Sequence, residues 1–78
     1  MIIIFSRDKF SYRLKELRKS RSVKQKELGQ IVGLAESAIN NLENKRRSPS
    51  IEIAVALADF FDVSLDYLVG RSDDPRRH

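Results

Sequence analysis

Apolar residues recur every three or four positions along most of this 78-residue chain, which is the spacing of amphipathic helices. The pattern predicts short helices at about residues 8–19, 25–32, 35–44, 51–61 and 65–69. Strand-like alternation is absent from the sequence except at residues 2–5. The chain is therefore expected to form one all-α domain, a compact bundle of five short helices.

The first three predicted helices each have one apolar face that should lie against the core. These inward positions are Phe10, Leu14, Leu17, Leu28, Ile31, Val32, Ala38, Ile39 and Leu42. The third helix then leaves polar side chains facing out, namely Glu36, Ser37, Asn40 and Asn41. Gly33 separates the second and third helices with almost no linker, and glycine suits the left-handed backbone of such a turn. The segment reads as a tight helix-turn-helix unit.

The fourth predicted helix has too many apolar residues for a single buried face. Ser50 is a good N-cap for it, as Ser64 is for the fifth helix, which Gly70 ends. One apolar stripe is formed by Ile51, Ala54, Leu57, Ala58 and Phe61, and the opposite stripe by Ile53, Ala56 and Phe60. We interpret the second stripe as a subunit interface, extended by the apolar residues 2–5. The alternative is that one subunit buries both stripes.

Positive charge is concentrated in the first part of the chain. Residues 1–47 hold 12 Lys or Arg against 5 Asp or Glu, whereas residues 48–78 hold 3 against 6, giving the net charge of +4. Three of the cations, Lys45, Arg46 and Arg47, directly follow the third helix. This asymmetry indicates an anionic partner for the first part. The alternative is that the basic residues only solvate helix faces.

The sequence argues against several other classes of protein. It has no cysteine, its only histidine is His78, and its glycines form no phosphate-binding loop, so we expect no enzyme, metal or cofactor, and no small-molecule ligand is evident. No apolar segment is long enough for a signal peptide core or a membrane span, which predicts a cytoplasmic protein without a membrane partner. We expect an N-terminal arm at residues 1–7, one domain at 8–70 and a flexible tail at 71–78.

Several motifs together resemble the helix-turn-helix domain of phage repressors and Cro, often called the XRE family. They are Arg13-Leu14-Lys15-Glu16-Leu17-Arg18, Gln25-Lys26-Glu27-Leu28, Gly33, Ala38-Ile39-Asn40-Asn41-Leu42-Glu43-Asn44, Pro49-Ser50-Ile51-Glu52 and Val63-Ser64-Leu65-Asp66-Tyr67-Leu68. Each motif alone is weak, but together they cover residues 10–70 in the order and spacing of the family. The resemblance implies a lambda-repressor-like bundle with the helix-turn-helix at its second and third helices.

The resemblance also implies roles for individual residues. The third helix would be the recognition helix in the DNA major groove, with base contacts from Glu36, Ser37, Asn40 and Asn41. Phosphate contacts would come from Lys24, Gln25, Lys45, Arg46 and Arg47. For Glu36 the alternative is a first-turn acid that stabilises the helix dipole. Arg18 and Glu43 match an ion pair of the family, and the alternative for them is two independent surface charges.

Three positions depart from the family pattern. Ser22 stands where glycine is common, so that connection should be slightly strained. Ala35 cannot cap the third helix, which should weaken its first turn by about 1 kcal/mol. Glycine is also common at Lys45, and we expect Asn44 to take the left-handed backbone there instead.

The resemblance and the charge together predict a sequence-specific double-stranded DNA-binding transcriptional regulator. We expect a repressor that binds a palindromic operator as a homodimer, with two recognition helices about 34 Å apart. One alternative is an antitoxin or a restriction-modification controller that uses the same fold. Another is a protein-interaction adaptor that does not bind DNA.

Overall fold

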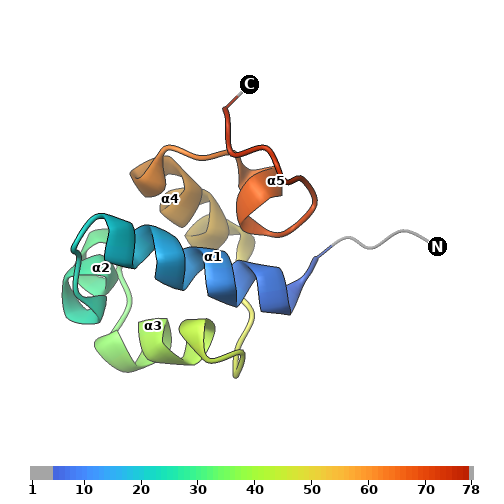
Figure 1. The fold of residues 1–78 in the computed structure, drawn as a ribbon. Helices are drawn as coiled ribbons and strands as arrows, with labels where there is room; N and C mark the ends of the chain where they lie inside the picture. Colours follow the sequence, from blue (N-terminus) through green and yellow to red (C-terminus); the bar gives the residue numbers. More distant parts are fainter. Residues whose placement is uncertain (1–4, 78) are drawn as a thin grey trace.

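The computed structural model describes residues 5–77. In this range the chain forms five helices and no strand: α1 (Arg7–Ser20), α2 (Gln25–Val32), α3 (Glu36–Glu43), α4 (Ile51–Phe61) and α5 (Leu65–Leu68) (Figure 1). The predicted all-α bundle of five helices is confirmed. The strand-like pattern at residues 2–5 and most of the expected N-terminal arm lie outside the described residues.

Helix α1 lies between the other helices. Figure 1 shows α3 on one side of α1 and both α4 and α5 on the other, with α2 at one end. Helix α2 packs against α3 and α4, and α1 packs against α3 and α5. The central position of α1 follows from its two fully buried apolar residues, Phe10 and Leu14, which join one core with residues from all the other helices.

Most of the predicted inward positions do face the core. The largest fully buried side chains are Phe10, Leu14, Leu28, Ile39, Leu42, Leu57, Phe61 and Leu68. The prediction is wrong for Ile31 and Ile51, which are 52% and 65% exposed. Leu28 and Val32 occupy the covered side of the short α2, and Ile51 is the first residue of α4, where the chain before it is irregular.

Local capping explains where the helices begin. The Ser50 and Ser64 side chains accept hydrogen bonds from the main-chain N–H groups of Ile53 and Tyr67, as predicted. The side chain of Ala35 makes no capping hydrogen bond to α3, also as predicted. These caps satisfy N–H groups that would otherwise lack partners in the first turn.

The backbone in the turns agrees with two predictions and contradicts a third. Gly33 is left-handed at φ +80°, and Ser22 has φ +55°, the strain expected there. Asn44 has φ −106°, whereas Lys45 has φ +64°, so the prediction of a left-handed Asn44 is wrong. Asn44 stays in line with α3 because its main-chain N–H and its side-chain amide both donate to the main-chain oxygen of Asn40.

The C-terminal segment is attached to the bundle, in contrast to the expected flexible tail at residues 71–78. The main-chain N–H of Ser64 donates to the Pro75 oxygen at 3.0 Å. Arg77 donates to the main-chain oxygens of Ala58 and Val63 and forms an ion pair with Asp59. The sequence did not indicate this attachment because the contacts join residues that are 11 to 19 positions apart.

Candidate nucleic-acid interface

The exposed side of α3 carries a shallow depression. It is lined by the side chains of Gln25, Glu36, Ser37, Asn40 and Asn41. Glu36 and Ser37 are exposed and the other three are partly exposed. The structure thus brings the four predicted base-contacting residues together on one surface, and it adds Gln25 from the first turn of α2.

Apolar contacts fix this orientation of α3. Ala38, Ile39 and Leu42 are buried, so the polar positions between them must face out. The buried hydroxyl of Ser11 on α1 donates to the main-chain oxygen of Leu42 at 2.6 Å, which ties the C-terminal half of α3 to α1. The residues of α3 that line the depression therefore belong to a packed helix and not to a loop.

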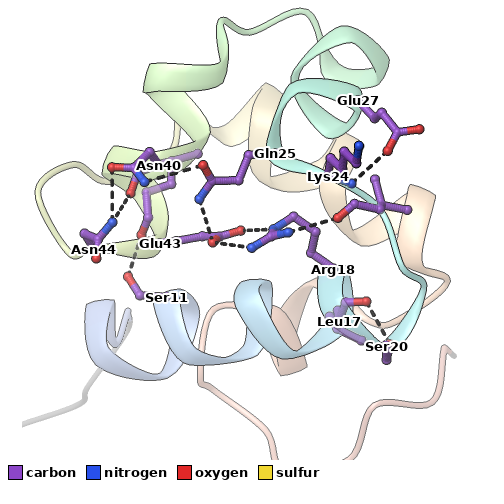
Figure 2. Close-up of polar contacts among 12 residues, drawn as sticks. Ser11, Leu17, Arg18, Ser20, Lys24, Gln25, Glu27, Asn40, Glu43 and Asn44 are labelled. Atoms are coloured by element: carbon purple, nitrogen blue, oxygen red, sulfur yellow. Dashed lines mark hydrogen bonds and ion pairs between the residues drawn. The ribbon is translucent and has the colours of Figure 1, made fainter.

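The Arg18 and Glu43 side chains meet between α1 and α3. Arg18 donates to the two Glu43 carboxylate oxygens at 2.5 and 3.0 Å and to the main-chain oxygen of Val23 at 2.9 Å. Glu43 is only 7% exposed. The hydrogen bond to Glu43 raises the pKa of Arg18 above its ordinary value, so Arg18 stays charged at physiological pH. The predicted partners are thus in contact, and Figure 2 shows them between α1 and α3.

Hydrogen bonds between side chains continue from this ion pair to the surface of α3. The amide of Gln25 donates to Glu43 at 3.0 Å, and the amide of Asn40 donates to the Gln25 oxygen at 3.4 Å. Asn44 donates to the side-chain oxygen of Asn40 at 3.2 Å (Figure 2). The sequence analysis missed these contacts because they depend on how α2 and α3 pack.

The predicted phosphate-contacting cations flank this surface. Lys24 immediately precedes α2 and is exposed, and Lys45, Arg46 and Arg47 are exposed just after α3. The main-chain N–H of Arg46 donates to the Asn41 oxygen at 3.0 Å, so the basic run begins where the polar face ends.

Two further contacts bring the start of α1 to this region. The Lys45 ammonium lies 3.4 Å from the carboxylate of Asp8, and Arg7 donates to the Ser48 hydroxyl at 3.1 Å. Both Asp8 and Lys45 are exposed. Asp8 was not among the predicted site residues. Its carboxylate gives Lys45, one of the predicted phosphate-binding cations, an acidic partner within the protein.

The residues assigned to a subunit interface are partly buried in this structure. Ile53, Ala56 and Phe60 are each of intermediate exposure, and Ile53 and Phe60 pack against the core. More apolar surface on α4 is exposed at Ile51 and at Val55, which is 40% exposed. The helix therefore has an exposed apolar edge beside the predicted stripe.

Two other kinds of feature were searched for in the described part of the chain. None of the helices in residues 5–77 has the length and apolar character needed to span a bilayer. No group of three His, Cys, Asp or Glu side chains in that range is arranged to hold a metal ion.

The arrangement of α2 and α3 defines a helix-turn-helix protein. The family model HTH_3, described as helix-turn-helix, matches residues 14–68. The chain belongs to this family, and the predicted family resemblance is confirmed.

Relatives and solved structures agree with this membership. The chain is 35% identical over 66 residues to the uncharacterised HTH-type transcriptional regulator YobD of Bacillus subtilis, covering 85% of this chain and 59% of YobD. It is 39% identical over 59 residues to the HTH-type transcriptional regulator AnsR of the same species, covering 76% of this chain and 51% of AnsR. The chain thus spans little more than half the length of these relatives.

The fold is similar to that of the P22 c2 repressor solved with a synthetic operator. The TM-score is 0.76 at 30% identity, covering 81% of this chain and 96% of the repressor chain. It is also similar to the restriction-modification controller protein C.AhdI from Aeromonas hydrophila, with a TM-score of 0.72 at 31% identity, covering 80% of this chain and 94% of the controller. The predicted repressor-like architecture is confirmed.

Proposed function

We propose that this chain is the double-stranded DNA-binding part of a sequence-specific transcriptional regulator. The observation that supports this most directly is the depression formed by Gln25, Glu36, Ser37, Asn40 and Asn41, with the basic residues 45–47 directly beyond it. A rigid helix that carries amide, hydroxyl and carboxylate groups on an exposed face can read base edges in the major groove. The adjoining cations supply attraction to phosphate that does not depend on sequence.

The proposal gives the polar residues distinct tasks. Asn41 can pair with adenine through one donor and one acceptor, and Glu36 can accept a hydrogen bond from cytosine. Ser37 can contact either type of base edge, and Gln25 and Lys24 stand at the start of α2, where main-chain N–H groups favour phosphate. Phosphates next to the end of α3 would be bound by Lys45, Arg46 and Arg47. The repressor operator complex of the P22 c2 protein supports this assignment by similarity.

The complete regulator is proposed to be a cytoplasmic repressor that binds a palindromic operator as a homodimer, without a cofactor. The α4 residues Ile53, Ala56 and Phe60, together with the more exposed Ile51 and Val55, are the proposed contact between subunits. Sedimentation of the purified protein tests this part. A species that remains monomeric at high concentration and on operator DNA contradicts the homodimer.

A restriction-modification controller is the second candidate function. The similarity to C.AhdI at 31% identity favours it over an antitoxin or an adaptor that does not bind DNA. A restriction or modification gene next to the gene for this chain would support the controller, whereas a neighbouring toxin gene would support the antitoxin. The repressor, the controller and the antitoxin would use the same DNA-contacting surface, whereas the adaptor would not bind DNA.

Selection from a random pool of duplex DNA with the purified protein tests the function. We expect an enriched motif, with two inverted half-sites whose centres are about one helical turn apart. Binding without any enriched motif contradicts sequence-specific recognition. Failure to bind any duplex, even at low salt, supports the adaptor and contradicts the proposal.

A further inference from the structure

Four side chains form a continuous line of hydrogen bonds that runs from the buried ion pair to the surface of the recognition helix. We call Glu43, Gln25, Asn40 and Asn44 the amide relay (Figure 2). Successive donor–acceptor distances are 3.0 Å, 3.4 Å and 3.2 Å. The relay is anchored because Arg18 holds the Glu43 carboxylate in place from α1.

The anchor determines which way each amide points. An ionised carboxylate only accepts hydrogen bonds, so Gln25 must direct its NH₂ group toward Glu43 and its oxygen away. Asn40 must then direct its own NH₂ group toward the Gln25 oxygen. The oxygen of Asn40 is left to accept from Asn44. The polarity of two side chains that line the surface depression is thus fixed by a buried charge.

This order leaves one N–H group free on each amide, while one of the two lone pairs of each amide oxygen is already used. Gln25 and Asn40 each have two amide N–H groups and use one of them in the relay. The oxygen atoms of both amides already accept a hydrogen bond within the protein. A pairing with adenine needs a donor and an acceptor from one amide, and at Asn40 the relay already uses one N–H group and one oxygen lone pair. Asn41 lies outside the relay and is not restricted in this way.

We infer that the amide relay makes Asn40 a specificity-determining donor. The remaining N–H group of Asn40 selects an acceptor atom on a base edge, such as guanine O6 or N7. Asn44 positions Asn40 for this contact, while Gln25 holds Asn40 and keeps its own free N–H group for phosphate. The inference rests on the proposed function, since it assigns the chemistry of the same surface. Two phosphate oxygens offer similar acceptors, so the experiment must separate a base edge from the backbone.

The relay itself can be tested without DNA. In the free protein, NMR of the side-chain NH₂ groups should show slowed proton exchange for Gln25 and Asn40. The variant Asn44→Ala should shift the Asn40 NH₂ resonances while the fold is kept, because Asn44 is exposed at the end of α3. Unchanged Asn40 resonances, with exchange as fast as that of an exposed asparagine, overturn the relay.

Base preferences of the variants then test the inference on DNA. For Asn40→Asp we expect the preference at one half-site position to change from guanine to cytosine, since a carboxylate accepts from the cytosine amino group. For Asn44→Ala we expect the guanine preference at that same position to fall about fivefold or more. The control Asn41→Ala should alter a different position, and Lys45→Gln should weaken binding to all sequences alike.

Two outcomes overturn the inference and can be told apart from failure of the proposed function. An equal loss of affinity on every sequence for Asn40→Asp means that the relay donates to phosphate. A base profile that neither Asn40→Asp nor Asn44→Ala changes means that Asn40 does not read a base. In both cases the wild-type protein still selects a motif, whereas failure of the proposed function leaves no motif to compare.

Discussion

Arg18 and Glu43 join α1 to the end of α3 through two hydrogen bonds, and the carboxylate of Glu43 is almost completely buried. Desolvation of two charges offsets most of what their attraction contributes, so such a pair does little for net stability when intact. The pair mainly fixes orientation, because the Glu43 carboxylate also accepts a hydrogen bond from the Gln25 amide and so holds that side chain in place. The position of α3 and the orientation of the Gln25 and Asn40 amides thus depend on one carboxylate.

Breaking this pair from one side should be costly. We expect Glu43→Ala to lower the free energy of unfolding by about 3–5 kcal/mol, because Arg18 is left with an unpaired charge in a partly buried position. Urea titration measures the loss. Asp8→Ala, which breaks the exposed pair with Lys45, is the control and should cost less than about 1 kcal/mol. A similar small loss for both variants would show that Arg18 and Glu43 behave as surface charges.

Gly29 allows α2 and the following turn to approach closely. A Cβ atom added there would lie 2.4 Å from the main-chain oxygen of Leu34. An alanine in a helix interior ordinarily stabilises by about 0.5–1 kcal/mol, but here overpacking should cost about 1–3 kcal/mol and dominate. We therefore expect Gly29→Ala to lower the melting temperature. An unchanged or higher melting temperature contradicts the close approach.

Gly33→Ala provides a comparison with a different cause. A Cβ atom at Gly33 would have no neighbour within 4 Å, but the left-handed backbone at φ +80° should cost about 1 kcal/mol. The atoms that would crowd a Cβ at Gly29 are main-chain atoms of Leu34 and Ala35, so a smaller side chain in the turn should rescue neither Gly29→Ala nor Gly33→Ala.

Local chemistry explains why much of the fold was predictable from the sequence. The helices, the caps at Ser50 and Ser64 and the turn at Gly33 all depend on residues within about four positions of one another. The same is true of the outward polar face of α3, which follows from the spacing of its buried residues. The contact between Arg18 and Glu43 is not local, and only the family resemblance indicated it.

The failures have a common physical reason. A helical pattern defines faces but not which neighbour covers each face, so Ile31 and Ile51 were wrongly placed inside. The attachment of Arg77 to Ala58 and the contact of Gln25 with Asn40 depend on packing between segments. These contacts are made by polar residues of kinds that are common on protein surfaces. The spacing of these residues in the sequence does not indicate that they meet.

The attached C-terminal segment should contribute to stability in a pH-dependent way. Arg13 donates to the carboxylate of Asp73 at 2.7 Å and holds the pKa of Asp73 below its ordinary value of 3.8. Because the folded-state pKa is lowered, the stabilisation is present above about pH 4 and is lost as the pH falls through the folded-state value. The carboxylate is exposed, so the effect should be small.

Urea midpoints at pH 7 and pH 2.5 measure this effect. We expect Asp73→Asn to lower the midpoint slightly at pH 7 and to lower it less at pH 2.5. Glu16→Gln, which removes an exposed carboxylate in the middle of α1 that has no ion pair among residues 5–77, is the control and should change neither value. An equal loss for Asp73→Asn at both pH values would mean that the charge of Asp73 contributes nothing.

The basic run should dominate the salt dependence of DNA binding. With about five phosphate contacts, log affinity should fall with log salt at a slope near −4.5. Replacing Lys45, Arg46 and Arg47 together by glutamine should reduce the slope to about −1.8, since each contact contributes about 0.9. Arg76→Gln removes one cation outside the proposed interface and should leave the slope unchanged, because Arg76 pairs with Asp74 in the C-terminal segment. A flat response of the wild-type protein contradicts the electrostatic interface.

Asp8 should weaken DNA binding by competing with phosphate for Lys45. The two side chains lie 3.4 Å apart and are exposed, so the pair is weak and must open when Lys45 binds the backbone. We expect Asp8→Asn to tighten binding a few-fold at low salt, equally for all sequences, and the gain should vanish near 1 M salt, where the screening length is about 3 Å. In the Lys45→Gln background the same substitution should have a much smaller effect. An equal gain in both backgrounds would mean that Asp8 repels DNA directly and does not act through Lys45.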